Sequence, residues 1–171
     1  MDLAIKPLHS LFVAELRGVD LSKDITLATQ QAIERAMDEY AVCILPDQTL
    51  DDEQQIAFSR RYGPLENASA VKAQRKAGVI GNRIRHPEIF DVSNLDENGN
   101  ILAATDDRWI YRQANELWHS DSSFRQRSST WSLLHACIVP PSGSDTCFAD
   151  TRAAYDALSD VTKRKIEGLV A

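Results

Sequence analysis

The sequence feature that most restricts the fold is a helix–strand–helix pattern between residues 26 and 64. Apolar residues recur at intervals of three and four between residues 26 and 40, and this spacing predicts a helix with one apolar face. Residues 41–45 form a short apolar run with β-branched members that stops at a proline, which predicts a buried strand. A second helix follows, capped by Thr49 or Asp51 and ended by a Gly-Pro pair. We therefore expect two helices separated by one buried strand.

Short strands are expected on both sides of this pattern. The expected strands are residues 11–16, 90–95, 117–119, 130–139 and 146–149. Residues 96–100 carry the Asn-Gly signal of a hairpin turn. Two further helices are expected, one capped by Asp150 or Thr151 and the other by Ser159 or Asp160. Early helices, then strands, then helices predict an α+β fold around a mainly antiparallel sheet.

The amino-acid composition is that of one globular domain spanning residues 1–171. Hydrophobic residues make up 43% of the chain, and the net charge of −6 argues against a nucleic-acid partner. The longest apolar run, residues 41–45, is too short to cross a membrane. No basic segment followed by an apolar stretch marks a secretory signal, and the three cysteines form no Cys-x-x-Cys pair. We therefore expect a cytoplasmic protein with reduced thiols and no membrane partner.

The segment 67–88 is basic and contains few large apolar residues. Its cationic residues are Lys72, Arg75, Lys76, Arg83 and Arg85. Two interpretations stay open, a solvated mobile loop and a lid that helps to bind an anion.

The tripeptide His119-Ser120-Asp121 is the strongest candidate for chemistry. On a strand, residues i and i+2 point to the same face, so His119 and Asp121 are expected to project together. An imidazole and a carboxylate are two of the three ligands in a facial triad for non-haem iron(II). The tripeptide alone also fits a surface histidine paired with a carboxylate. His135, on another expected strand, is either a third ligand or a packed or surface histidine.

Several segments, in order along almost the whole chain, resemble the taurine dioxygenase family of Fe(II)- and 2-oxoglutarate-dependent dioxygenases. They are residues 18–21, 39–42, 46–48, 58–65, 115–124, 141–146 and 148–158. The run Trp118-His119-Ser120-Asp121-Ser122-Ser123-Phe124 and the segment 149–158 favour the branch that acts on aryloxyalkanoates such as 2,4-dichlorophenoxyacetate.

The resemblance implies a fold and a set of site residues. The fold is a double-stranded β-helix, or jelly roll, with flanking helices. His119 and Asp121 are implied to bind iron, Thr146 to hydrogen-bond the carboxylate of 2-oxoglutarate, and Asn115 to line the substrate side of the pocket. Ser144 departs from the family pattern, which usually has a second glycine at that position.

The resemblance also implies an incomplete site and an incomplete jelly roll. Family members continue beyond the length of this sequence and supply a second iron histidine and an arginine for 2-oxoglutarate from that later part. The sequence therefore resembles the N-terminal portion of a jelly-roll dioxygenase domain, and 171 residues alone are expected to be inactive.

The implied reaction hydroxylates an aryloxyalkanoate and yields a phenol, glyoxylate, succinate and CO2. The implied partners are a small acidic substrate, O2 and further copies of the same chain. Two alternatives stay open. One is a dioxygenase for taurine or another sulfonate. The other is a catalytically incomplete fragment that serves as a binding or oligomerisation module.

Overall fold

The computed structural model describes residues 3–66, 73, 76, 83–107, 109, 116–123, 125–143 and 145–169. The chain forms two compact units, one of Met1–Asp51 with His135–Ala171 and the other of Asp52–Leu134. Most of the basic segment 67–88 lies outside the described residues, so both of its interpretations stay predictions. The expectation of a single domain also stays a prediction.

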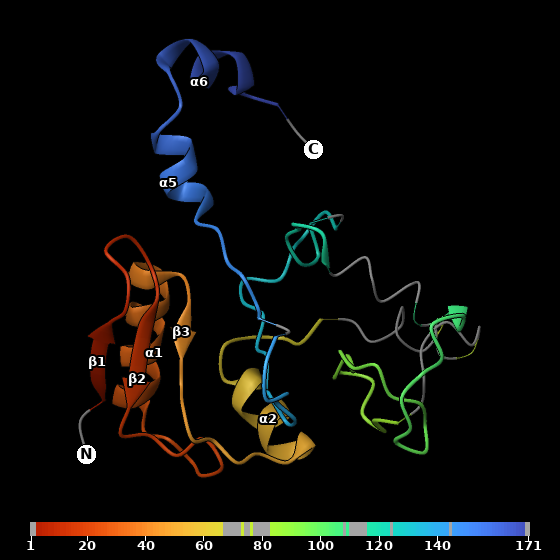
Figure 1. Ribbon diagram of the computed structural model, residues 1–171. Coiled ribbons are helices and arrows are strands. Elements are labelled where there is room, and N and C mark those ends of the chain that lie inside the picture. The colour runs from red at the N-terminus through yellow and green to blue at the C-terminus, as the bar shows by residue number, and fades with distance from the viewer. Residues whose placement is uncertain are drawn as a thin grey trace. The chain divides into compact units, whose positions relative to one another are not determined.

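The first unit contains a three-stranded sheet in the order β1-β2-β3 (Figure 1). Strand β2, Ala14–Arg17, lies between β1, Ala4–Pro7, and β3, Cys43–Ile44. It pairs antiparallel with β1 and parallel with β3. The expected strand 11–16 begins late, at residue 14, because Val13 has a φ of 76° and leaves the extended conformation.

Helix α1, Leu27–Tyr40, confirms the predicted helix and packs beside the sheet (Figure 1). Its N-cap is Thr26, whose hydroxyl accepts a hydrogen bond from the Thr29 amide at 3.1 Å. The apolar face buries Ile33 and Ala36, while β2 buries alternate residues on its own inner face. Burial of each large aliphatic side chain contributes about 1.5–3 kcal/mol, so this helix–sheet contact forms the core of the unit.

Gln48 ties together two loops of the first unit. Its Oε1 accepts a hydrogen bond from the Leu21 amide at 2.9 Å. Its Nε2 donates to the carbonyls of Val19 and Pro46, both at 3.0 Å. The sequence segments 18–21 and 46–48 are thus joined through one half-buried amide.

The two helices expected late in the chain are confirmed. Helix α5 spans Thr151–Asp156 and is capped by Asp150, and α6 spans Asp160–Ile166 and is capped by Ser159. The Arg152 side chain pairs with Asp150 at 3.1 Å and donates to the Asp38 carbonyl, at the end of α1, at 3.0 Å. Its hydrogen bond lowers the pKa of the Asp150 carboxyl below the ordinary value. Arg152 therefore fastens the start of α5 to the end of α1.

The second unit is organised around helix α2, Asp52–Arg60, which also confirms its prediction. The helix buries Ile56 and Phe58, and Tyr62 lies in ring contact with both Phe58 and Trp131. The Asn-Gly turn forms as expected, with a single antiparallel bridge between Leu95 and Ile101. The expected strand 90–95 is therefore reduced to its last residue.

Three further expected strands are wrong for the described residues. Residues 117–119, 130–139 and 146–149 pair with no neighbouring strand there. Apolar patterning shows which side chains a strand could bury, whereas a strand forms only where another backbone supplies hydrogen bonds. In these unpaired segments Trp118 is 73% exposed and Ile138 is 77% exposed. The described sheet is therefore small and mixed instead of mainly antiparallel.

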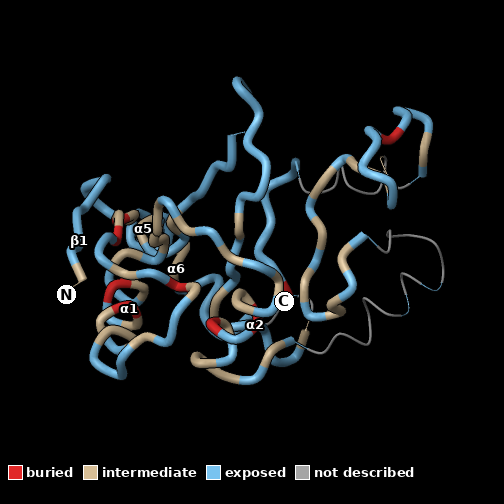
Figure 2. Tube along the Cα trace, turned by 90° about the horizontal axis from the view of Figure 1, so that it is seen from below, coloured by how far each residue is buried: buried red, intermediate tan, exposed pale blue. Residues whose placement is uncertain are grey.

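The buried parts of the trace lie mainly in and around α1 and α2, while most of the trace outside them is exposed or intermediate (Figure 2). None of the helices in the described ranges is long and apolar enough to cross a bilayer.

Candidate metal centre

His119 and Asp121 lie side by side in the second unit. The His119 Nε2 is 3.3 Å from the Asp121 Oδ1. The sequence predicted that the two side chains would project together, but from the face of a strand. In the structure residues 118–120 belong to no strand, and a turn at residues 121–123, in which Ser122 has a φ of 55°, begins at Asp121.

A backbone hydrogen bond sets which imidazole nitrogen faces Asp121. The His119 Nδ1 lies 2.7 Å from the Leu117 carbonyl oxygen. Because a carbonyl can only accept, Nδ1 carries the proton in this contact, so in the neutral form of the ring, the form that binds a metal, Nε2 holds the lone pair and faces the carboxylate. Metal-binding histidines are held in the same way, by a hydrogen bond from the nitrogen that does not bind the metal.

The pair fits a divalent metal ion. With metal–ligand bonds of about 2.1 Å, two donor atoms 3.3 Å apart are close enough to bind the same ion. One imidazole and one carboxylate match two positions of the 2-His-1-carboxylate set used by non-haem iron(II). The side chains are 46% and 58% exposed, so positions beside them are open to small molecules. Within the described ranges no group of three histidine, cysteine, aspartate or glutamate side chains is placed to share an ion.

The other predicted site residues are placed less completely. Thr146 is exposed, four residues before the cap of α5 in the first unit. Asn115 and Ser144 lie outside the described residues. His135 has its Nδ1 3.6 Å from the Cys137 sulfur. The roles of His119, Asp121, Thr146 and Asn115 stay predictions.

Sequence reasoning missed Glu66. Its Oε2 accepts hydrogen bonds from the hydroxyls of Ser122 and, at 3.1 Å, Ser129, and its Oε1 forms an ion pair with the Arg125 Nε. These partners are 56 or more residues away in the sequence, so no local pattern identifies them. The one signal was that segment 58–65, which ends next to Glu66, belongs to the family-like segments.

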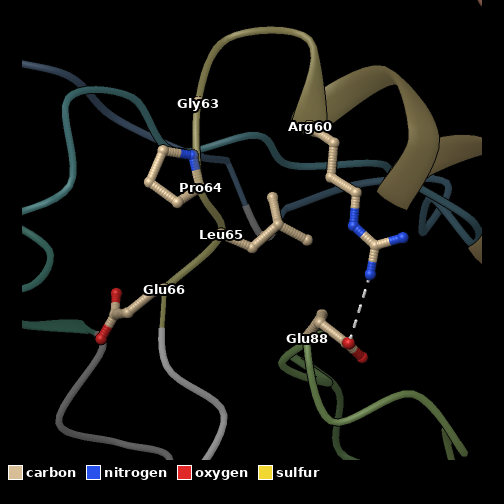
Figure 3. Close-up of a pocket in the computed structure, with 6 residues that line it drawn as sticks. All are labelled: Arg60, Gly63, Pro64, Leu65, Glu66 and Glu88. Atoms are coloured by element: carbon tan, nitrogen blue, oxygen red, sulfur yellow. Dashed lines mark ion pairs between the residues drawn. The ribbon is translucent and has the colours of Figure 1, made fainter.

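A hollow of about 510 Å³ lies beside Glu66 (Figure 3). It is lined by Arg60, Gly63, Pro64, Leu65, Glu66 and Glu88. Across it, Arg60 forms an ion pair with Glu88 at 3.6 Å.

A protein-family model described as "Taurine catabolism dioxygenase TauD, TfdA family" matches residues 4–171. The chain is 41% identical over 171 residues to the alpha-ketoglutarate-dependent 2,4-dichlorophenoxyacetate dioxygenase of Cupriavidus pinatubonensis, covering all of this chain and 58% of that protein. It is 36% identical to the (S)-phenoxypropionate/alpha-ketoglutarate-dioxygenase of Sphingobium herbicidovorans, covering 98% of this chain and 52% of the relative.

Among solved structures, the chain is similar to AAD-2 in complex with Mn(II) and N-oxalylglycine. The TM-score is 0.90 at 42% sequence identity, and the match covers 98% of this chain and 56% of that one. The chain thus spans a little more than half the length of the curated relatives it matches.

Proposed function

Because the chain belongs to the taurine dioxygenase TauD/TfdA family, we propose that the protein is an Fe(II)- and 2-oxoglutarate-dependent dioxygenase acting on an aryloxyalkanoate. The observation that carries the proposal is the pairing of His119 Nε2 with Asp121 Oδ1 at 3.3 Å. The hydrogen bond between His119 Nδ1 and the Leu117 carbonyl leaves Nε2 available as a ligand atom.

His119 and Asp121 would hold the iron, which supplies O2 activation coupled to the decarboxylation of 2-oxoglutarate to succinate and CO2. The protein supplies orientation. The Leu117 carbonyl keeps the imidazole in the tautomer that presents Nε2. The Thr146 hydroxyl donates to a carboxylate oxygen of 2-oxoglutarate, and Asn115 contacts the substrate. These two roles rest on the family resemblance.

The substrate class rests on the relatives. Two of them, at 41% and 36% identity, are named for 2,4-dichlorophenoxyacetate and (S)-phenoxypropionate. Hydroxylation of the carbon between the ether oxygen and the carboxylate gives a hemiacetal, which collapses to a phenol and, from an aryloxyacetate, glyoxylate. One oxygen atom of O2 enters the hydroxylated carbon and the other enters succinate, so the atoms balance.

The proposal extends to the fold and the setting of the protein. Apolar side chains of the segment 133–139 are exposed here, and in the proposed jelly-roll fold they are expected to be covered. The free cysteines Cys43, Cys137 and Cys147 fit a cytoplasmic location, and association between copies is part of the proposal.

Succinate production by the full-length protein tests the function. With Fe(II), 2-oxoglutarate and O2, an aryloxyacetate should be turned over faster than taurine. His119→Ala and Asp121→Ala should each abolish succinate formation, whereas His9→Ala is the matched histidine control and should remain active. Normal turnover in either ligand variant would refute the assignment. A separate measurement of metal binding tests His135. If His135→Ala no longer binds the metal, His135 is a third ligand.

A further inference from the structure

The turn at residues 121–123, which begins at Asp121, depends on contacts from elsewhere in the chain. Residues 117–123 belong to no helix or strand in the structure. Ser122, next to Asp121, has a φ of 55°, a left-handed conformation that residues with a β-carbon rarely adopt. Local backbone preference therefore does not hold this turn, and long-range contacts must do so.

Ser122 is held through its side chain. It is the one buried polar residue in the described part of the chain, with 9% of its surface exposed. Its hydroxyl donates to the Glu66 Oε2, and its carbonyl accepts from the Arg125 amide at 3.0 Å. A buried hydroxyl that lost this acceptor would keep its desolvation penalty, so the contact favours this conformation of the turn.

Both carboxylate oxygens of Glu66 contact side chains between residues 122 and 129. Oε2 accepts from the hydroxyls of Ser122 and Ser129, and Oε1 pairs with the Arg125 guanidinium. Within the hollow the carboxylate points away from the ion pair of Arg60 with Glu88 (Figure 3). The two carboxylates that line the hollow therefore have different partners. Glu88 pairs with Arg60, whereas Glu66 binds residues in and after the turn at 121–123.

We propose that Glu66 is a positioning residue of the metal centre. By holding the Ser122 hydroxyl, it fixes the backbone that follows Asp121 and so sets the Asp121 carboxylate against His119 Nε2. The proposal rests on the proposed function, in which His119 and Asp121 bind the metal. Glu66 acts through Ser122 and not as a ligand.

Direct metal binding by the full-length, metal-free protein tests this role. Mn(II) is titrated by calorimetry, and Co(II) is followed by its visible absorption, which reports ligand geometry. Glu66→Gln keeps the shape of the side chain and removes its charge. We expect it to weaken Mn(II) binding by about 10–100-fold, as for other groups that orient metal ligands. The Co(II) absorption should change as well.

Glu88→Gln is the matched control, because it makes the same chemical change in the same hollow. It should leave both metal readouts unaltered. Ser122→Ala should weaken Mn(II) binding in the same direction as Glu66→Gln. The double variant should lose less than the product of the two single effects, since Ser122→Ala removes the contact that Glu66→Gln weakens by replacing a charged acceptor with a neutral one.

Ser122→Gly tests the hydroxyl contact with Glu66 separately from the left-handed backbone conformation. Glycine accepts a φ of 55° without strain but has no hydroxyl. Weaker Mn(II) binding in this variant supports the proposal, whereas equal or tighter binding overturns it.

The remaining outcomes are equally decisive. If the wild-type protein binds Mn(II) and Glu66→Gln binds it equally well, the role of Glu66 is overturned and the proposed function stands, even if the variant melts at a lower temperature. If the wild-type protein binds no metal, the role of Glu66 and the proposed function are both refuted. If Glu66→Gln does not fold, Ser122→Ala decides, and wild-type binding by that variant overturns the proposal.

Discussion

Replacing Gln48 by leucine should destabilise the protein through three hydrogen bonds lost at once. The side chain accepts from the Leu21 amide and donates to the carbonyls of Val19 and Pro46, at 2.9–3.0 Å. Leucine has similar volume but offers neither a donor nor an acceptor. Gln48→Leu therefore removes all three bonds without opening a large cavity.

The magnitude follows from the geometry. A neutral hydrogen bond contributes about 1 kcal/mol net, so three contribute about 3 kcal/mol. Gln48 is only half-buried, so water reaches some of the released groups and the expected loss is about 2 kcal/mol. With a denaturant slope of about 2 kcal/mol per M, the urea midpoint should fall by about 1 M.

Urea unfolding of the full-length protein followed by circular dichroism measures this change. Gln31→Leu is the matched control, because Gln31 is exposed on α1 and its replacement should change stability by less than about 0.5 kcal/mol. Equal midpoints for the two leucine variants would refute the assigned role of Gln48.

Gln48→Glu adds a dependence on pH. The introduced carboxylate faces the carbonyl oxygens that now accept from Nε2, which disfavours its charged form and raises its folded pKa above the unfolded value of about 4.3. Below that value the protonated acid donates a hydrogen bond and the stability is retained. As the pH rises through the folded pKa, stability is lost relative to wild type. A deficit that is the same at pH 4 and pH 7 would contradict this.

Three further outcomes are expected. Thr146→Val should raise the 2-oxoglutarate concentration needed for half-maximal turnover by about ten-fold or more while leaving the melting temperature unchanged, because a charge-assisted hydrogen bond of about 1.5–3 kcal/mol is lost. An unchanged titration would exclude Thr146 from the site. Burial raises the pKa of the Cys43 thiol to about 11, so at pH 8 iodoacetamide should label the exposed Cys137 and Cys147 first, as mass spectrometry can show. Fast labelling of Cys43 would disagree. Residues 1–171 expressed alone should aggregate through the exposed apolar segment 133–139, and a monodisperse monomer in light scattering would contradict this.

The sequence determined the elements whose causes are local. Helices α1 and α2 appear close to their predicted positions, because apolar periodicity and the Gly-Pro stop act within a few residues. For α5 and α6 the sequence offered two cap candidates each, Asp150 or Thr151 and Ser159 or Asp160, and the structure has Asp150 and Ser159. The family likewise follows from short ordered motifs, and the comparison over residues 4–171 confirms it.

The tertiary structure decided whatever depends on a distant partner. Residues 130–139 have the composition of a strand but pair with none in the described ranges, since a strand requires the backbone of another segment. The side chains of His119 and Asp121 lie together at 3.3 Å, but residues 117–119 form no strand, and a turn with a left-handed Ser122 follows at residues 121–123. Glu66 lies 56 residues from the Ser122 hydroxyl it holds, and no pattern within one segment can express a contact made only when the chain folds.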